Sequence, residues 1–338
     1  MQLRSALKAN LLLIVALTAT TSPAQDLKFL NHNKPLFDAH NCYPYEGKWA
    51  DRIERALKTG TPVAIEQDLA WHVDKATGRG SVVVSHAEEA TGAEPTLRQH
   101  FFERVRPMMD QALKANDRSK WPLIVLHFDF KGKEDALFRA VWDILGEYEG
   151  WITTAKKGAD PSKLEAFDAR PLLVLTEESD AQEAVFFTQV PVGKKLRLFG
   201  SAHTKKIEGQ TREERAHIAV STPPAGLLSE RPTNYRRWWN NPWAIVEEGG
   251  QTKAGDWTAA DNVRLKSLVD HAHKLGFWIR FYTLDGFTPE ENRGWDKNYN
   301  FGSREAVQAR WKAAIDAGVD LIAADQYEDF SAFLKSNR

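Results

Sequence analysis

Two carboxylates stand two residues apart at the end of an apolar segment. Residues 63–65 (Val-Ala-Ile) lead directly into Glu66 and Asp68. Alternate side chains of an extended strand share a face, so both carboxylates are expected to point the same way. Like charges held this close repel each other unless a cation or a proton lies between them. Oxygen ligands at this spacing suit a hard cation, Mg²⁺ or Ca²⁺.

Histidines follow two other apolar segments. Residues 35–39 lead to His40, and residues 81–85 lead to His86. An imidazole titrates near neutral pH and can therefore give or take a proton, which lysine and arginine cannot do easily. Imidazoles beside carboxylates indicate a metal-assisted acid–base site, with two histidines serving as base and acid on opposite sides of a phosphodiester.

Other polar residues stand where further strands are expected to end. Asp129 offers a third carboxylate, and Asn41 offers an amide oxygen. Lys131 and Arg280 carry positive charge that could neutralise phosphate oxygens. The predicted site therefore comprises three metal ligands, two acid–base residues and four substrate-binding residues: Glu66, Asp68 and Asp129; His40 and His86; Asn41, Lys131, Arg280 and Tyr282.

Strand and helix patterns alternate along the chain, which indicates a parallel α/β architecture. About eight strands over some 300 residues favour a single-domain (β/α)₈ barrel of the TIM type over an open sheet, with the site at the carboxyl ends of the strands. The expected strands are 35–39, 63–68, 121–130, 171–176, 196–200, 217–220, 277–283 and 318–324, and the expected helices are 47–59, 95–113, 134–145, 259–275, 304–317 and a short one from 327.

Two segments do not follow this alternation clearly. Residues 81–86 fit either a barrel strand or a ribbon inserted after the second strand. Residues 222–257 are rich in Pro and Trp, and we interpret them as a long connection rather than a separate domain.

Composition excludes several classes of protein. The 338 residues contain 45 Lys and Arg against 46 Asp and Glu, so no net basic field indicates a nucleic-acid partner. A hydrophobic content of 42% with 12 Trp supports a substantial core and argues against disorder. Cys42 is the only cysteine, so the chain has no internal disulfide framework.

The N-terminus has the pattern of an export signal. Arg4 and Lys8 precede a short apolar run at 11–17, and a Ser-Pro-Ala cleavage pattern follows. The run is shorter than the ~20 residues that a membrane-spanning helix needs. We interpret residues 1–24 as a signal peptide and 25–338 as the barrel, which predicts a secreted or periplasmic protein. Intact-mass analysis of the exported protein should show cleavage after residue 24, and a retained N-terminal methionine would contradict it.

Four motifs together resemble the phospholipase C-like phosphodiesterase superfamily: FDAHNCY at 37–43, AIEQD at 64–68, VSH at 84–86 and FDFK at 128–131. This superfamily includes glycerophosphodiester phosphodiesterases, calcium-dependent phosphoinositide phospholipases C and sphingomyelinase D. The resemblance covers roughly residues 35–335. It implies a TIM barrel, an acid–base pair and one divalent cation. The implied roles are His40 and His86 for the pair, Glu66, Asp68 and Asp129 for the cation, and Asn41 as a candidate fourth ligand.

The chain departs from the glycerophosphodiesterase pattern at two places. These enzymes usually show His-Arg-Gly where this chain has His-Asn-Cys at 40–42, so the phosphate-binding arginine of that motif is missing. The His-Asn pair is closer to the calcium-dependent phospholipases, which cyclise an inositol phosphate. The third carboxylate is Asp129 rather than glutamate, as in sphingomyelinase D. The alcohol, the choice of Mg²⁺ or Ca²⁺, and hydrolysis against cyclisation therefore stay open.

The resemblance implies a secreted, metal-dependent phosphodiesterase that acts on a glycerophosphodiester or a phospholipid-type phosphodiester, with transient contact to a membrane surface. The alternatives are a sphingomyelinase D-like lyase and a non-catalytic barrel that binds a phosphorylated ligand or a glycan. His40 and His86 favour the enzyme, because a pure binder has no need of two imidazoles. The sequence does not indicate an oligomeric state or which histidine is the acid.

Overall fold

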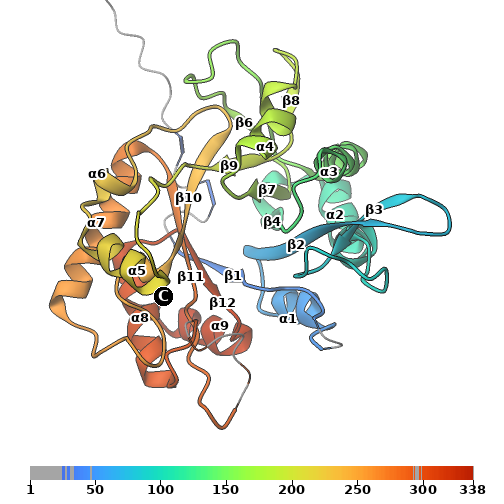
Figure 1. Cartoon of the computed structure of the whole chain (residues 1–338). Coiled ribbons are helices and arrows are strands. Elements are labelled where there is room, and N and C mark those ends of the chain that lie inside the picture. Colours follow the sequence, from blue (N-terminus) through green and yellow to red (C-terminus); the bar gives the residue numbers. More distant parts are fainter. Residues whose placement is uncertain are drawn as a thin grey trace, which may run out of the picture.

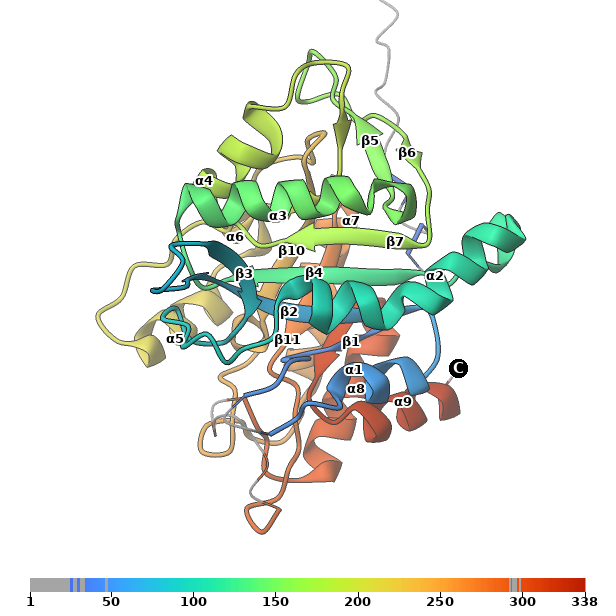
Figure 2. The ribbon, with the colours of Figure 1, turned by 90° about the vertical axis from the view of Figure 1, so that its right-hand side faces the viewer.

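Eight parallel strands close into a barrel, which confirms the predicted (β/α)₈ architecture. The computed structural model describes residues 25–26, 29–30, 34–45, 48–291, 293, 297 and 299–337, so the predicted signal peptide lies outside it. The strands follow the order β1, β12, β11, β10, β9, β7, β4 and β2, and β1 also pairs with β2. Figure 2 shows β7, β4 and β2 side by side. The barrel strands are β1 (Leu36–Ala39), β2 (Val63–Val73), β4 (Ile124–Phe130), β7 (Leu172–Thr176), β9 (Phe199–Ser201), β10 (Arg236–Pro242), β11 (Trp278–Tyr282) and β12 (Leu321–Ala324).

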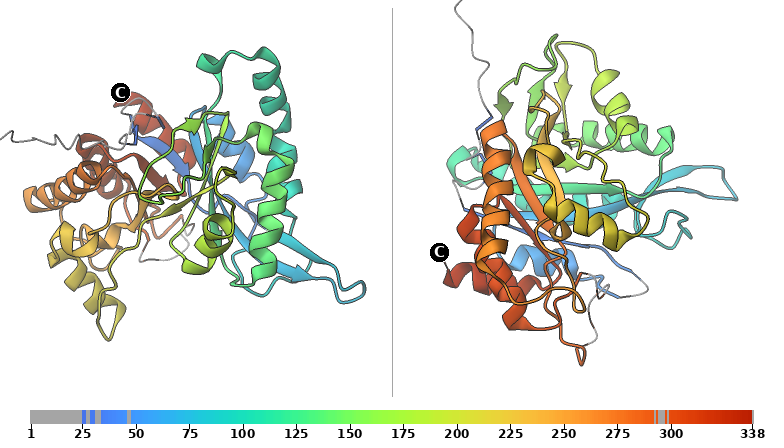
Figure 3. Two further views of the ribbon diagram at one scale, coloured as in Figure 1. Left: turned by 90° about the horizontal axis from the view of Figure 1, so that it is seen from above. Right: turned by 60° about the vertical axis from the view of Figure 1, so that its left-hand side comes forward.

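The helices lie around the outside of the barrel (Figures 1 and 3). They are α1 (Arg52–Lys58), α2 (Glu103–Ala115), α3 (Asp135–Glu147), α4 (Asp180–Glu183), α5 (Arg212–Ser221), α6 (Pro224–Leu227), α7 (Ala259–Leu275), α8 (Arg304–Ala317) and α9 (Tyr327–Ser336). Shorter turns are η1 (Arg98–Phe102), η2 (Arg118–Lys120), η3 (Glu149–Trp151), η4 (Ala184–Thr188) and η5 (Trp243–Ile245), and β5 (Thr154–Lys156), β6 (Phe167–Asp168) and β8 (Lys195–Leu196) form a small separate sheet. Within the described part of the chain, no helix is both long and apolar enough to cross a membrane.

Local signals in the sequence explain where the helices begin and end. In α3 the buried residues recur every three or four positions, so one apolar stripe faces the barrel. Helix α7 begins at a capping box formed by Thr258 and Asp261. It ends at Gly276, whose φ of 103° favours glycine.

Strand β2 is long because it belongs to two pairings. Val63–Leu69 runs parallel to β4, and the rest of β2 pairs with the antiparallel strand β3 (Gly80–Val84) in a hairpin that projects from the barrel (Figure 1). The segment 81–86 is therefore an inserted ribbon and not a barrel strand. The backbone N–H of Ser85 donates to the carbonyl of Asp68 at 3.0 Å, so the hairpin returns the chain to the carboxyl end of the barrel at His86.

Two sequence-based assignments were wrong. The segment 217–220, expected as a strand, lies inside α5, whose N-terminus is capped by the side chain of Thr211. The segment 222–257, expected as a connection, contains α6 and the barrel strand β10. Buried Arg237 and Asn241 interrupt the apolar pattern of β10, and Arg237 is accommodated because its guanidinium donates to the Glu165 carbonyl and the Asn234 side chain, each at 2.9 Å. A buried polar residue interrupts the apolar pattern by which a strand is recognised in a sequence, even when the folded protein supplies its hydrogen-bond partners.

A buried histidine of the core makes stability depend on pH. The side chain of His100 is inaccessible, and its Nε2 lies 3.3 Å from the Cys42 carbonyl. Burial, with a smaller contribution from Arg104, lowers the pKa of His100 to about 4. Because this folded-state pKa is below the unfolded value of ~6.5, His100 stabilises the fold above that pH, and the contribution is lost as pH falls toward 4.

Urea unfolding at pH 7 and pH 4.5 tests this contribution. We expect roughly 2.5 kcal/mol of the loss in unfolding free energy between these two pH values to come from His100, at about 1.4 kcal/mol per pKa unit. The His100→Gln variant should therefore show a shallower decline with pH than the wild type. Identical declines in the two proteins would contradict the assignment.

Candidate functional site

Three carboxylates converge where β2 and β4 end. Residues Asp68 and Asp129 are directly opposite each other in the β2–β4 register, and Glu66 shares a strand face with Asp68. Carboxylate oxygens of all three lie within 4.8 Å of one another. Glu66 and Asp68 are 4% and 0% exposed. The structure thus brings together the three residues that the sequence proposed as metal ligands.

The two carboxylate oxygens of Asp68 have different surroundings. Its Oδ2 accepts from His86 Nδ1 and Lys131 Nζ, each at 2.8 Å, and from the Tyr43 hydroxyl at 2.9 Å. Its Oδ1 is buried and has no hydrogen-bond partner among the described residues. Burial raises the pKa of Asp68 above its usual value, although His86 and Lys131 oppose this.

The donor set fits a hard divalent cation. A buried carboxylate oxygen without a partner costs about 1–3 kcal/mol or more, and an ion would satisfy it. Lys131 Nζ also lies 2.6 Å from Asp129. Burial lowers the pKa of Lys131, but the charges of Asp68 and Asp129 outweigh burial and raise this pKa above its usual value. The carboxylates of Glu66, Asp68 and Asp129 are the oxygen ligands that a hard divalent cation prefers.

His40 lies between two carboxylates at the end of β1. Its Nε2 is 4.0 Å from Glu66, and its Nδ1 is 3.5 Å from Asp325, which in turn accepts from Arg52 at 2.9 Å. Burial lowers the pKa of His40, but Glu66 and Asp325 outweigh it and raise the pKa to about 9. Both carboxylates favour the protonated imidazole, which is the form that can donate a proton.

The side chain of Asn41 is buried and contacts His40, Asp325 and Tyr43. Asn41 is 5% exposed and has a φ of 51°, in the left-handed region that asparagine tolerates. Its Nδ2 lies 2.9 Å from His40 Nδ1 and 3.3 Å from both Asp325 oxygens. Its Oδ1 lies 2.7 Å from the hydroxyl oxygen of Tyr43.

His86 reaches the same cluster from the end of the hairpin. Its side chain is 41% exposed, and its Nδ1 lies 2.8 Å from Asp68 Oδ2. An ionised carboxylate can only accept, so Nδ1 carries the hydrogen and donates it. In the neutral imidazole Nε2 is then the acceptor.

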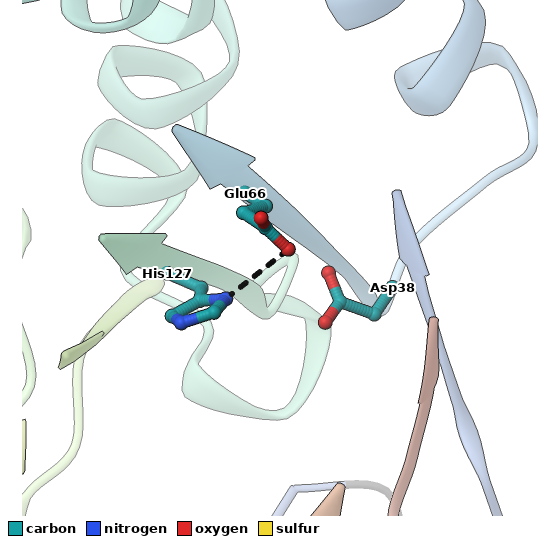
Figure 4. A group of neighbouring side chains, drawn as sticks. All are labelled: Asp38, Glu66 and His127. Atoms are coloured by element: carbon teal, nitrogen blue, oxygen red, sulfur yellow. Dashed lines mark ion pairs between the residues drawn. The ribbon is translucent and has the colours of Figure 1, made fainter. Parts of the chain in front are cut away.

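A second polar group lies inside the barrel, beneath these residues. Figure 4 shows Asp38, Glu66 and His127 pointing toward one another from β1, β2 and β4. Arg280, 1% exposed, donates through Nε to Asp38, through Nη2 to Glu66 and through Nη1 to Asn240 at 3.0 Å. The sequence analysis placed Arg280 among the substrate contacts, but its guanidinium is engaged inside the barrel, where it holds Glu66.

His127 adds a further contact to Glu66. Its Nδ1 is 3.5 Å from Glu66 Oε2, and its Nε2 is 3.3 Å from Glu177 Oε1. Burial and Arg280 lower the pKa of His127, but Glu177 and Glu66 outweigh them and raise it to about 9. Burial raises the pKa of Glu66, but the positive charges of His40, Arg280 and His127 outweigh it and hold the pKa well below its usual value.

Removing Arg280 should destabilise the barrel strongly. In Arg280→Met two buried carboxylates, Asp38 and Glu66, lose their guanidinium, so we expect the unfolding free energy to fall by about 3–5 kcal/mol. The matched control is Arg55→Met, which removes an exposed pair with Glu328 and should cost at most about 1 kcal/mol. Urea unfolding of both variants checks the difference, and equal losses would contradict the role given to Arg280.

The other sequence-predicted residues lie around the two histidines. The ring of Tyr282 stacks on His40 with centroids 5.9 Å apart. Lys131 is placed between Asp68 and Asp129 as described above. The sequence analysis missed Tyr43 and Arg52. Tyr43 lies in an irregular loop, and Arg52 on α1 contacts Asp325 beyond the end of β12, so neither strand nor helix periodicity could have revealed them.

Neither a protein-family model nor a curated protein matches the chain. Among solved structures, the chain is similar to a glycerophosphoryl diester phosphodiesterase from Parabacteroides distasonis, with 12% identity, a TM-score of 0.41 and 93% of each chain covered. A calcium-dependent phosphoinositol-specific phospholipase C from a Pseudomonas species has 15% identity and a TM-score of 0.37, with 89% of this chain and 91% of that chain covered. The HPPK-DHPS of Plasmodium falciparum has 10% identity and a TM-score of 0.40, with 89% of this chain and 46% of that chain covered. These identities and TM-scores are too low to assign a family or an activity.

Proposed function

We propose that the chain is a secreted phosphoric diester hydrolase that needs one divalent cation and acts on a glycerophosphodiester or a phospholipid-type phosphodiester. One observation carries the proposal: two imidazoles contact different carboxylates of a single cluster. His40 Nε2 lies 4.0 Å from Glu66, and His86 Nδ1 lies 2.8 Å from Asp68. A phosphodiester bound at the cluster would have one imidazole on each side, as acid–base cleavage requires. Export and transient membrane contact are part of the same proposal.

Glu66, Asp68 and Asp129 would hold the cation, Mg²⁺ or Ca²⁺. When bound, it would supply charge that polarises a phosphate oxygen. Lys131 carries a second positive charge at the cluster, and its side chain is 21% exposed, so it can approach a phosphate oxygen. Arg280 keeps Glu66 in place from inside the barrel.

The surroundings of His86 and His40 favour different roles in proton transfer. His86 donates through Nδ1 to Asp68, so its neutral form presents Nε2 to accept a proton from the attacking water or substrate hydroxyl. His40 lies between Glu66 and Asp325, which favour its protonated form, so it suits donation to the leaving oxygen. The new O–P bond forms as the P–O bond to the leaving alcohol breaks. Attack by water gives a phosphomonoester, and attack by a substrate hydroxyl gives a cyclic phosphodiester, as a sphingomyelinase D-like lyase would.

Initial rates on a panel of phosphodiesters test this proposal. The panel should contain glycerophosphodiesters, phosphoinositides, sphingomyelin and lysophosphatidylcholine, each assayed with Mg²⁺, with Ca²⁺ and with excess chelator. We expect cleavage of at least one class that stops with chelator and returns when the cation is restored. Binding of a phosphorylated ligand or a glycan without cleavage of any diester would instead favour the non-catalytic barrel.

A further inference from the structure

The hydroxyl of Tyr43 lies where the two halves of the site meet. Tyr43 is fully buried in the loop after β1. Its oxygen is 2.7 Å from Asn41 Oδ1, 2.9 Å from Asp68 Oδ2 and 3.1 Å from His86 Nδ1. These groups come from the turn that carries His40, from β2 and from the end of the hairpin. One buried oxygen therefore contacts three separately positioned segments of the site.

The donors and acceptors around this hydroxyl restrict its hydrogen bonds. Asn41 Oδ1 and Asp68 Oδ2 can only accept, and the hydroxyl has one hydrogen to donate to one of them. Its oxygen can accept from the hydrogen on His86 Nδ1, the same hydrogen that Asp68 accepts. Tyr43 and Asp68 thus favour the same His86 tautomer, in which Nδ1 carries the hydrogen and Nε2 is the acceptor atom.

The aromatic ring of Tyr43 limits the rotation of His86 as well. The two rings stack with centroids 6.3 Å apart and an interplanar angle of 13°. The hydroxyl also helps to hold Asp68 by Oδ2, which leaves Oδ1 as the carboxylate oxygen without a partner among the described residues. The same residue therefore constrains a proposed base and a proposed metal ligand.

We propose that Tyr43 is a positioning residue that holds the Asp68–His86 pair in a fixed relation to the His40–Asn41 turn, so that both histidines face one phosphodiester. This inference rests on the proposed function for its catalytic consequence. It acts through Asp68 and His86 and does not require Tyr43 to touch substrate. Outer partners of this kind typically contribute 10–100-fold to metal affinity or activity.

Tyr43→Phe removes only the hydroxyl, and the chain offers a matched control. Tyr235 is also buried, but its hydroxyl has no hydrogen-bond partner among the described residues, and its ring packs on Phe187 instead. With Mg²⁺ or Ca²⁺ at saturation, Tyr43→Phe should lower kcat about 10–100-fold and change KM little. Tyr235→Phe should match the wild type in both constants.

The tautomer of His86 gives a readout that needs no activity. In ¹⁵N-histidine spectra of the wild type at a pH where His86 is neutral, its signal, identified by its loss in His86→Gln, should be that of the Nδ1–H form. Tyr43→Phe should shift this signal toward a mixture of tautomers, and Tyr235→Phe should not.

Two results would overturn the inference. One is a wild-type spectrum in which His86 gives the signal of the Nε2–H form. This measurement does not depend on the folding of any variant. The other is a Tyr43→Phe protein with wild-type kcat and an unchanged His86 signal. If the wild type cleaves no phosphodiester, the proposed function fails while the spectra still decide whether Tyr43 positions His86.

Discussion

Replacing His40 or His86 with alanine should lower kcat for phosphodiester cleavage by about 10²–10⁴-fold, because each replacement removes one proton transfer from the reaction. Metal affinity should change much less, since the proposed ligands are carboxylates. Initial rates at saturating substrate and cation measure the first effect, and calorimetric titration with the cation measures the second. His217→Ala is the matched control, because His217 is exposed on α5 and pairs only with Glu248 among the described residues. It should retain wild-type kcat.

The double variant of His40 and His86 separates concerted from independent roles. Two groups that act in one step are strongly non-additive, so the double variant should lose far less than the product of the two single losses. Full activity after either single replacement would remove that histidine from the mechanism. It would leave the non-catalytic binding barrel as the better account.

Asp68→Asn should weaken cation binding and abolish most activity. The substitution removes one negative charge from the cluster and places an NH₂ group among the donors of His86, Lys131 and Tyr43, or turns it toward the cation. We expect the dissociation constant for Mg²⁺ or Ca²⁺ to rise about 10²-fold or more, since even an outer partner of a metal ligand contributes 10–100-fold. The fold should persist, because the variant keeps the shape of the side chain.

Calorimetric titration with each cation and thermal unfolding check this prediction together. Asp316→Asn is the control, because Asp316 is exposed on α8 and pairs with Lys312. It should bind the cation as the wild type does. Unchanged cation affinity in Asp68→Asn would exclude Asp68 as a ligand, whatever the outcome of the activity assays.

Much of the fold could be predicted because barrel strands buried on both faces read as continuous apolar runs. The segments 121–130 and 318–324 were recognised in this way, and they contain β4 and β12. Strand β10 was missed because buried Arg237 interrupts its apolar pattern, and the Glu165 carbonyl and Asn234 side chain that accept from its guanidinium are brought to it only by folding. The hairpin stayed ambiguous because an apolar strand looks the same whether its neighbour runs parallel or antiparallel.

The carboxylate cluster was predictable for a local reason. Glu66 and Asp68 share a face through the two-residue period of a strand, and adjacent parallel strands end at the same edge, which brings in Asp129. The role of Arg280 could not be predicted from the sequence. Its guanidinium contacts Asp38 and Glu66 on other strands, and these residues come together only when the barrel closes. Tyr43 depends likewise on the path of an irregular loop.

Anomalous diffraction from a crystal grown with Mn²⁺, in place of Mg²⁺ or Ca²⁺, tests most directly the claim that one cation organises this site. The account predicts a single strong peak within the ~2.0–2.6 Å reach of oxygens from Glu66, Asp68 and Asp129. Asp68→Asn crystals treated identically should show a much weaker peak. A peak among Asp38, Glu66 and His127 instead, or none at the three carboxylates under conditions that support catalysis, would contradict it.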